Sequence, residues 1–385
     1  MDSVIEKSRC TGCHACFNAC PAGAIRMEED KEGFLFPAID AQACVDCGLC
    51  RMSCPVLHPP ELFQGESTYA CAAAERDLRL GSSSGAVFTL LAEDTLRNGG
   101  VVCGAAFDGP ERVRHVLAET PEQLSRIKGA KYVQSEIGDV FQRIDSALKS
   151  GRRVLFSGTG CQAAGLKSFL GFDPEELLTV DMICHGVPSP AVWRDYLKEM
   201  GKDSPVAEAE FRAKEPSGGR SCFRLRFVNG EELGHAYQDD FYVKGFLQNL
   251  YLRESCFSCP FKGTQRCSDM TIGDFWSVKE YHPALDDGYG VSAVLTHSEK
   301  GDRAFRRILP QLNWERARAS EAACWNECLL HSVAPTDKRA VFYSRWRSEG
   351  LLDLLGDLTA EKDERSNNKT SIAKKALRKL KSLFS

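Results

Sequence analysis

Short apolar runs alternate with amphipathic segments through the middle of the chain. The apolar stretch 68–74 is followed by the small-residue segment 81–85 and then by a periodic apolar segment that stops at 98–100. Small hydroxyl residues before such a segment and glycines after it predict a capped helix. An apolar run over 101–107 and a helical pattern over 138–149 come next. Strands that alternate with helices in this way predict a parallel α/β layer.

Two strand–helix pairs in this layer end in similar loops. A strand over 153–156 leads through a loop with Cys161 into a helix over 163–170, and a strand over 177–183 leads through a loop with Cys184 into a helix over 190–200. Ligands of parallel sheets bind beyond the carboxyl ends of the strands. We therefore expect both loops, and their cysteines, to face one crevice.

The pattern also marks the flanking regions. Segments 24–27 and 33–39 predict a strand–turn–strand, and the proline-rich segment after Pro55 predicts a linker. Strand-like segments recur at 209–212, 222–227 and 268–276. The polar stretch 358–370 predicts a flexible spacer. Segment 372–384 has the pattern of a short basic amphipathic helix, which suits an anionic membrane surface or a partner, although a solvated tail fits equally.

Composition narrows the class of protein. The chain has 385 residues, 43% of them hydrophobic, with a net charge of −4 and 18 cysteines. This length predicts two or three domains, and the mild charge gives no sign of nucleic acid as a partner. The N-terminus has no secretory leader and no run is apolar enough to cross a bilayer, so we expect a reducing, cytoplasmic location, with the inner face of the membrane as a peripheral contact.

Two cysteine runs with identical spacing lie near the N-terminus. Each has the form C-x-x-C-x-x-C-x-x-x-C-P, over 10–21 and 44–55. Such a doubled run holds two [4Fe–4S] clusters in bacterial-type ferredoxins, where the fourth cysteine of each run ligates the other cluster. This predicts two ligand sets, which are Cys10, Cys13, Cys16 with Cys54, and Cys44, Cys47, Cys50 with Cys20. Disulfides or zinc are the alternatives, but neither requires this spacing.

A further C-x-x-C, at Cys256 and Cys259, is ambiguous among zinc, a redox dithiol and cluster ligation. With the loop cysteines Cys161 and Cys184 it makes four, so we predict a third [4Fe–4S] cluster on this set. Cys267 is the rival ligand, and a structural zinc is the alternative metal. The remaining cysteines, at 71, 103, 222, 324 and 328, are interpreted as small buried hydrophobic residues.

The small-residue segment before the first helix can also bind phosphate, because a helix start presents free backbone N–H groups. An ordinary capped helix is the simpler interpretation. Farther on, segment 127–135 places two lysines, a glycine and a tyrosine together, which alone indicates only a solvated loop.

Taken together, several motifs resemble one family. The chain is similar to the coenzyme F420 hydrogenase/dehydrogenase beta-subunit family, in the form with an N-terminal two-cluster ferredoxin domain. The matching motifs lie in this order: GSSSG at 81–85, KGAKYV at 128–133, FSGTGCQ at 156–162, CHG at 184–186, SCFSC at 255–259 and SDMTIGDFW at 268–276.

The resemblance implies FAD in the α/β unit beside a cluster, with electrons passing between a deazaflavin, the flavin and the clusters. The family usually has proline where this chain has Gly160, so this loop is predicted to be looser. The FAD contacts that the resemblance implies are Ser82, Ser83, Ser84, Gly85, Lys131, Tyr132, Gly158 and Thr159.

We accordingly predict a multidomain α+β and α/β protein. The expected units are a two-cluster ferredoxin-type domain over 1–60, an α/β flavin-binding unit over 65–205, a smaller C-terminal α+β unit with the C-x-x-C over 206–350, and a polar linker with the basic tail over 351–385.

Two functions remain open. The first is an iron–sulfur flavoprotein oxidoreductase that passes electrons between a deazaflavin or a small organic substrate and a ferredoxin-type partner or larger complex. The second is an electron-relay subunit without flavin. His185 is the candidate for proton delivery, with a surface or capping role as the alternative.

Overall fold

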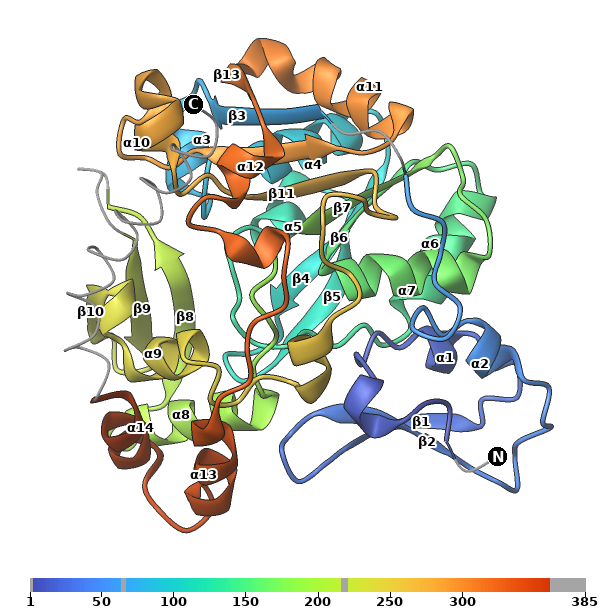
Figure 1. Ribbon diagram of the computed structural model, residues 1–385, viewed down its shortest axis with the longest axis vertical. Coiled ribbons are helices and arrows are strands. Elements are labelled where there is room, and N and C mark those ends of the chain that lie inside the picture. The colour runs from blue at the N-terminus through green and yellow to red at the C-terminus, as the bar shows by residue number, and fades with distance from the viewer. Residues whose placement is uncertain (1–2, 64–66, 216–220, 361–385) are drawn as a thin grey trace, which may run out of the picture.

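The N-terminal unit is a small hairpin domain that holds both cysteine runs. The structure is a computed structural model that describes residues 3–63, 67–215 and 221–360 (Figure 1). Strands β1 (Ile25–Glu29) and β2 (Leu35–Ile39) pair in antiparallel fashion, which confirms the predicted strand–turn–strand. Single helical turns lie within or beside the cysteine runs. They are η1 (Lys7–Arg9), α1 (Ala15–Asn18) and α2 (Leu49–Met52).

An eight-stranded mixed sheet forms the centre of the molecule, with the order β13-β3-β12-β11-β7-β6-β4-β5. Its strands are β3 (Ser67–Ala73), β4 (Val101–Phe107), β5 (Val113–Ala118), β6 (Val154–Gly158), β7 (Leu177–Met182), β11 (Met270–Asp274), β12 (Ser292–Thr296) and β13 (Leu312–Ala317). Strands β11, β7, β6 and β4 are parallel, and every other pairing is antiparallel. The predicted parallel layer is therefore the middle of a larger mixed sheet.

The carboxyl ends of the parallel strands lie together along one end of this sheet, which we call the sheet edge. Because β12 is antiparallel to β11, its first residue, Ser292, lies opposite Asp274 at the end of β11. Ser292 also pairs with Cys71 near the end of β3. The loops that follow β3, β6, β7 and β11 are thus gathered along one edge, where ligands of α/β sheets bind.

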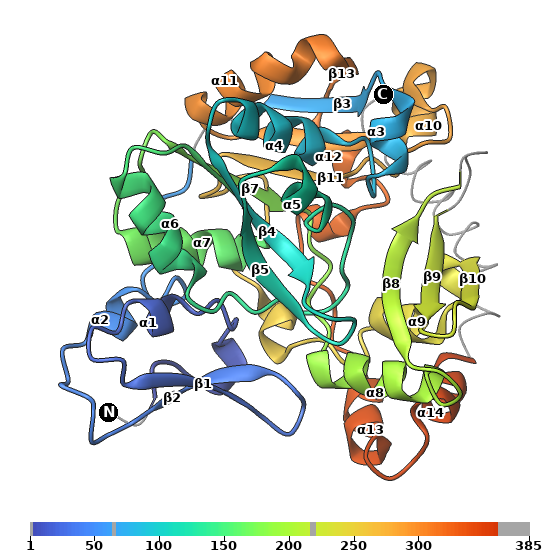
Figure 2. The same cartoon turned by 180° about the vertical axis from the view of Figure 1, so that it is seen from behind.

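Helices cover both faces of the sheet (Figure 2). Helices α4 (Val87–Arg97) and α11 (Glu299–Ile308) pack on one face, against side chains such as Val102 and Leu155. Helices α6 (Val140–Lys149) and α7 (Gly160–Leu170) pack on the other, against Cys103 and Val154. Adjacent residues such as Val102 and Cys103 contact helices on opposite faces, because consecutive side chains of a strand point to opposite faces of the sheet. Short elements complete this part: α3 (Arg76–Leu80), α5 (Pro121–Ser125), α10 (Val278–Tyr281), α12 (Ala319–Ala323), η4 (Pro283–Leu285), η5 (Leu309–Gln311) and η6 (Glu327–Leu329).

A three-stranded antiparallel sheet stands beside the main one (Figures 1 and 2). It packs through an aromatic core that includes Trp193, Phe211 and Tyr242. Its elements are β8 (Val206–Ala213), β9 (Cys222–Phe227) and β10 (Glu232–Ala236), with α8 (Pro190–Met200), α9 (Phe241–Leu247), α13 (Asp337–Arg345), α14 (Leu351–Thr359), η2 (Tyr237–Asp239) and η3 (Glu254–Ser258).

The predicted units meet in the main sheet, which takes strands from both 65–205 and 206–350. The tail expected from residue 351 begins with helix α14, where Leu351, Leu354 and Leu355 are fully buried. Its remainder, including the segment 372–384, lies outside the described residues. Within the described ranges, no helix has the length and apolarity needed to cross a membrane.

Candidate cluster and cofactor sites

The first cysteine set is brought together where the N-terminal domain packs against α6 and α7 of the central unit. Cys10, Cys13, Cys16 and Cys54 are each 7–8% exposed. Burial raises the pKa of Cys13 to about 12, and the nearby Cys10 and Cys54 add to this rise. Buried thiols of this kind lose their protons to a metal, because iron supplies the positive charge that the site otherwise lacks. We call this set the inner group.

The second set lies nearer the surface. Cys20, Cys44, Cys47 and Cys50 all line one cavity. Burial raises the pKa of Cys50, with further contributions from Cys20 and Cys47, whereas Cys47 itself is exposed. Four cysteine residues around one cavity are the number of ligands that a cubane cluster takes. We call this set the outer group.

A third set gathers at the sheet edge. Cys161 is the second residue of α7, Cys184 follows β7, and Cys256 and Cys259 lie in and just after η3. Burial raises the pKa of Cys161 well above its usual range, and Cys259, Cys184 and Cys256 raise it further. The backbone N–H of Val187 lies 3.4 Å from the sulfur of Cys256. The four cysteines of the predicted third cluster are therefore neighbours.

Two other cysteines differ in their surroundings. Cys267 is buried beside Asp181, Lys167 and Arg266, and none of the third set contributes to its raised pKa. Cys328, interpreted from sequence as a small buried residue, is only partly buried, and its sulfur lies 3.5 Å from Nδ1 of His185. Cys328 therefore adjoins the third set, and Cys267 does not.

The spacing of these side chains bears on the choice of metal. Among the described residues, no three cysteine, histidine or carboxylate side chains converge tightly enough for one metal ion. Zinc needs four ligands at about 2.0–2.3 Å from one centre. A cubane takes four thiolates around a larger object than a single ion.

His185 lies beside the third set rather than on the open surface. Its Nε2 is 2.7 Å from Oδ1 of Asn249, and burial lowers its pKa. Lys262 donates to the carbonyls of Cys184 and Cys328. A half-buried, largely neutral imidazole is thus held between the third set and the aromatic core.

The segment 81–85, which we call the serine segment, lies at the same end of the sheet. Its hydroxyls form hydrogen bonds with other parts of the protein. Ser83 Oγ accepts a hydrogen bond from the Ala130 N–H at 2.6 Å, and Ser84 Oγ donates to the Val291 carbonyl at 3.0 Å. Helix α4 starts after Ala86, which has a φ of 67° and makes no side-chain cap. The sequence predicted a serine cap, but the helix start is left to its backbone N–H groups, which favour an anion.

Two basic residues of β8 and its end hold this segment, and sequence reasoning missed both. Arg212 donates to Oδ2 of Asp274 at 3.0 Å and to the Ser83 carbonyl at 3.4 Å. Lys214 donates to the Ser84 carbonyl at 2.7 Å, and burial lowers its pKa to about 8. Asp274 belongs to a motif that the sequence did single out, but the contacts span 60 or more residues and leave no local signal.

The other predicted FAD contacts are divided between two places. Tyr132 packs edge-on against Phe211, and its hydroxyl accepts from Arg212 at 3.4 Å. Lys131 turns back to three carbonyls of its own loop, and burial lowers its pKa to about 7. The Gly158–Thr159 turn instead adjoins the third set, since Thr159 Oγ1 is 3.1 Å from the sulfur of Cys161.

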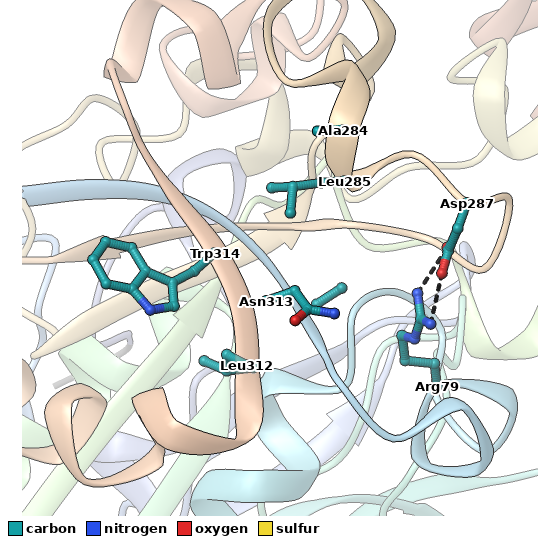
Figure 3. A pocket seen from close by; sticks show the side chains of 8 residues that line it. Arg79, Ala284, Leu285, Asp287, Leu312, Asn313 and Trp314 are labelled. Atoms are coloured by element: carbon teal, nitrogen blue, oxygen red, sulfur yellow. Dashed lines mark hydrogen bonds and ion pairs between the residues drawn. The ribbon is translucent and has the colours of Figure 1, made fainter.

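A separate pocket lies on the other side of the serine segment. It is bordered by β13 and the loop after η4, and Figure 3 shows Arg79 paired with Asp287 at its rim. Trp314 and Asn313 form another wall. None of the predicted site residues lines this pocket.

A ferredoxin-like domain with two cysteine sets, joined to a mixed α/β sheet, defines an iron–sulfur redox protein. The model of a 4Fe-4S dicluster domain matches residues 9–57. Models of the "Coenzyme F420 hydrogenase/dehydrogenase, beta subunit" N-terminal and C-terminal parts match residues 68–142 and 151–320. The chain belongs to this beta-subunit family, and it is an iron–sulfur oxidoreductase subunit of that type.

Individual relatives are distant. An uncharacterised protein of Methanocaldococcus jannaschii is 21% identical over 349 residues, which cover 80% of this chain and 89% of that one. An uncharacterised ferredoxin of the same organism is 29% identical over 55 residues, covering 14% of this chain and 70% of its own. A chain of the xenon-derivatised F420-reducing [NiFe] hydrogenase complex from Methanosarcina barkeri has a TM-score of 0.46 at 15% identity, covering 78% and 91% of the two chains.

Proposed function

We propose that this protein is a flavin-containing electron converter with three [4Fe–4S] clusters. It exchanges electron pairs with a deazaflavin or small organic substrate at FAD, and single electrons with a redox partner protein through the clusters. The observation that carries the proposal is the position of the third cysteine set, between the predicted flavin loops and the N-terminal domain.

The chemistry follows from the cofactors. Flavins accept two electrons as a hydride and release them one at a time, and each cluster carries one, so protein groups need only bind and position. Tyr132, the serine segment and the uncapped start of α4 would hold the flavin. His185 is positioned to exchange a proton at Nε2 or Nδ1.

The residues present suit an anionic, aromatic cofactor. Arg212 lies 5.1 Å from the ring of Trp276 and 5.6 Å from that of Tyr237, and Trp276 is 52% exposed. A guanidinium among aromatic faces stabilises stacked rings. The uncapped helix start supplies donors for phosphate nearby. This combination supports FAD at the edge formed by β3, β11 and β12.

A short route leads from there into the N-terminal domain. Cys161 and Gly165 are one turn apart on α7, about 6 Å along the helix axis. A Cβ added at Gly165 would lie 3.0 Å from the sulfur of Cys13. The third set and the inner group therefore flank one turn of α7. The outer group, which includes the exposed Cys47, continues the route toward the surface.

Anaerobic purification tests the proposal. We expect a flavin spectrum near one per chain and about twelve iron atoms, from three clusters of four. Deazaflavin, nicotinamide and reduced ferredoxin should then be compared as reductants of the same sample. Absence of flavin after reconstitution with FAD would contradict the converter and favour a flavin-free relay subunit.

A further inference from the structure

Arg253 is a fully buried cation between the N-terminal domain and the rest of the molecule, with 1% of its surface exposed. Its Nε donates to the carbonyl of Cys10 at 2.7 Å, and Nη2 lies 3.6 Å from the sulfur of Cys10. Nη2 also donates to the Leu35 carbonyl at 3.0 Å. Nη1 donates to Gln134 at 3.1 Å, and the Gln134 amide donates to the Thr11 carbonyl at 3.0 Å. The guanidinium is thus fixed against the first cysteine loop.

This charge has no carboxylate within ion-pair distance among the described residues. Its other neighbours are the rings of Phe36 and Phe34, at 4.1 and 5.4 Å. A buried charge without a counter-charge is costly, so proteins pair buried charges or bind ions to them. The thiol in contact with this charge is that of Cys10 in the inner group, which becomes a thiolate when iron binds.

The position of Arg253 separates the two ferredoxin-type clusters. It contacts Cys10 of the inner group, and its charge also acts on Cys256, whose pKa it lowers against the larger effect of burial. Among the described residues, none of its hydrogen bonds or ring contacts involves the outer group, which lines a cavity and includes the exposed Cys47. One buried positive charge therefore acts on one of two otherwise similar clusters.

We propose that Arg253 is the counter-charge of the inner cluster and raises its reduction potential above that of the outer cluster. Reduction adds one electron, and so one negative charge, to a cluster, and a fixed positive charge a few ångströms away stabilises that reduced form. Electrons then settle on the inner cluster before they move outward. Arg253 is a positioning residue that acts through charge, and the inference rests on the proposed inner-group ligands.

The test is an anaerobic redox titration of the full chain, followed by electron paramagnetic resonance of the reduced clusters. Arg253→Gln removes the charge but keeps a hydrogen-bond donor. At a fixed ambient potential, the ratio of reduced to oxidised inner cluster should fall by up to about a thousandfold, as expected for one charge at about 4 Å in an effective dielectric of about 20. Arg253→Lys keeps the charge and should stay close to the wild-type ratio. Cys47→Ser identifies the outer-cluster signal, which should not move in the Arg253 variants.

The matched control is Arg339→Gln. Arg339 also joins the N-terminal domain to the rest of the molecule, but it is paired with Glu32, and its other hydrogen bond among the described residues goes to the Leu252 carbonyl rather than to a cysteine. Its loss should leave both potentials unchanged. An unmoved inner signal in Arg253→Gln with normal iron overturns the inference, and so does an equal shift in Arg339→Gln.

Two outcomes separate other failures. Should Arg253→Gln lose iron, Arg253→Lys decides: retained iron with a wild-type ratio supports the role of charge, and lost iron shows that only the hydrogen bonds matter and overturns it. If the wild-type protein, which carries both Cys10 and Cys54, binds no inner cluster, the proposed ligands of the inner cluster are refuted instead.

Discussion

The cysteines of this chain differ in what raises their pKa values. Cys71 and Cys103 are fully buried, and burial alone or nearly alone raises their pKa values. The inner, outer and third sets differ because their members raise one another's pKa values as well. At the scale of single residues, thiols grouped in this way are the ones we expect to hold iron.

Cys256→Ala should therefore remove about four iron atoms per chain, since one absent thiolate opens the third cluster. Cys267→Ala is the matched control. Cys267 also lies near the C-x-x-C in the sequence, but it is surrounded by Asp181, Lys167 and Arg266. Iron analysis of anaerobic samples measures both. Unchanged iron in the first variant, or the same loss in the second, would refute the ligand set.

His115 gives a pH-dependent stability. Its Nε2 donates to the Ser157 carbonyl at 3.0 Å, its Nδ1 accepts from Ser135 at 2.9 Å, and burial lowers its pKa from 6.5 to about 4. The fold thus favours the neutral ring, so stability is complete above about pH 6.5 and falls as the pH drops toward 4, by roughly 3 kcal/mol.

Thermal unfolding at pH 7 and pH 4.5 tests this effect. The wild-type midpoint should fall more between the two values than that of His115→Gln, which cannot take up the proton. His331→Gln, at an exposed position, should behave like the wild type. Equal acid sensitivity in all three proteins would show that His115 contributes nothing.

At the scale of elements, local spacing was predictable and long-range contacts were not. The hairpin, helix α8 and strands β3, β4 and β7 follow from patterns within 5–11 residues, and the predicted ranges agree with them to within two residues. The antiparallel edge strands β13 and β5 were missed; the partner of β13 is the distant β3, whereas β5 pairs with the preceding β4. Arg212, Lys214 and Arg253 were missed because each acts on a segment that sequence alone does not place beside it.

The close approach of α4 to the sheet yields a prediction at this scale. A Cβ at Gly85 would lie 2.5 Å from the Cys71 carbonyl and 2.9 Å from the Ser292 backbone nitrogen. Gly85→Ala must separate β3, β12 and the serine segment, at a cost of about 1–3 kcal/mol. We expect a lower melting temperature and less bound flavin.

Gly81→Ala is the control for this change. The nearest atom to a Cβ at Gly81 is the Asp77 carbonyl oxygen, at 3.8 Å, and its φ is −78°. Its stability and flavin content should match the wild type. If both alanine variants have the same melting temperature and flavin content, the close packing at Gly85 does not determine either property.

At the scale of the whole molecule, exposed apolar side chains lie around the outer group. Val45, Leu49 and Met52 are 67, 47 and 60% exposed and lie in or next to the second cysteine run. Exposed apolar side chains close together are typical of contact surfaces. The proposed redox partner would meet the chain here.

Met52→Glu should therefore slow electron exchange with a protein partner such as ferredoxin, while exchange with a small dye stays unchanged. Val228→Glu adds the same charge at a position that is 68% exposed on the β9–β10 turn, and it should have no effect. Stopped-flow reduction with both acceptors makes the comparison. Equal slowing in both variants would point to net charge rather than to this surface.

The order of strands in the main sheet has a consequence for synthesis of the chain. Strand β3 lies between β12 and β13, which emerge from the ribosome more than two hundred residues later. Chains are made at about 5–20 residues per second, and distant pairings close slowly. Both N-terminal cysteine runs are complete by residue 55, whereas the serine segment gains its contacts with Val291 and Ser292 only when β12 has joined β3. A chain interrupted before residue 292 would therefore carry both cysteine runs but lack the two strands that flank β3.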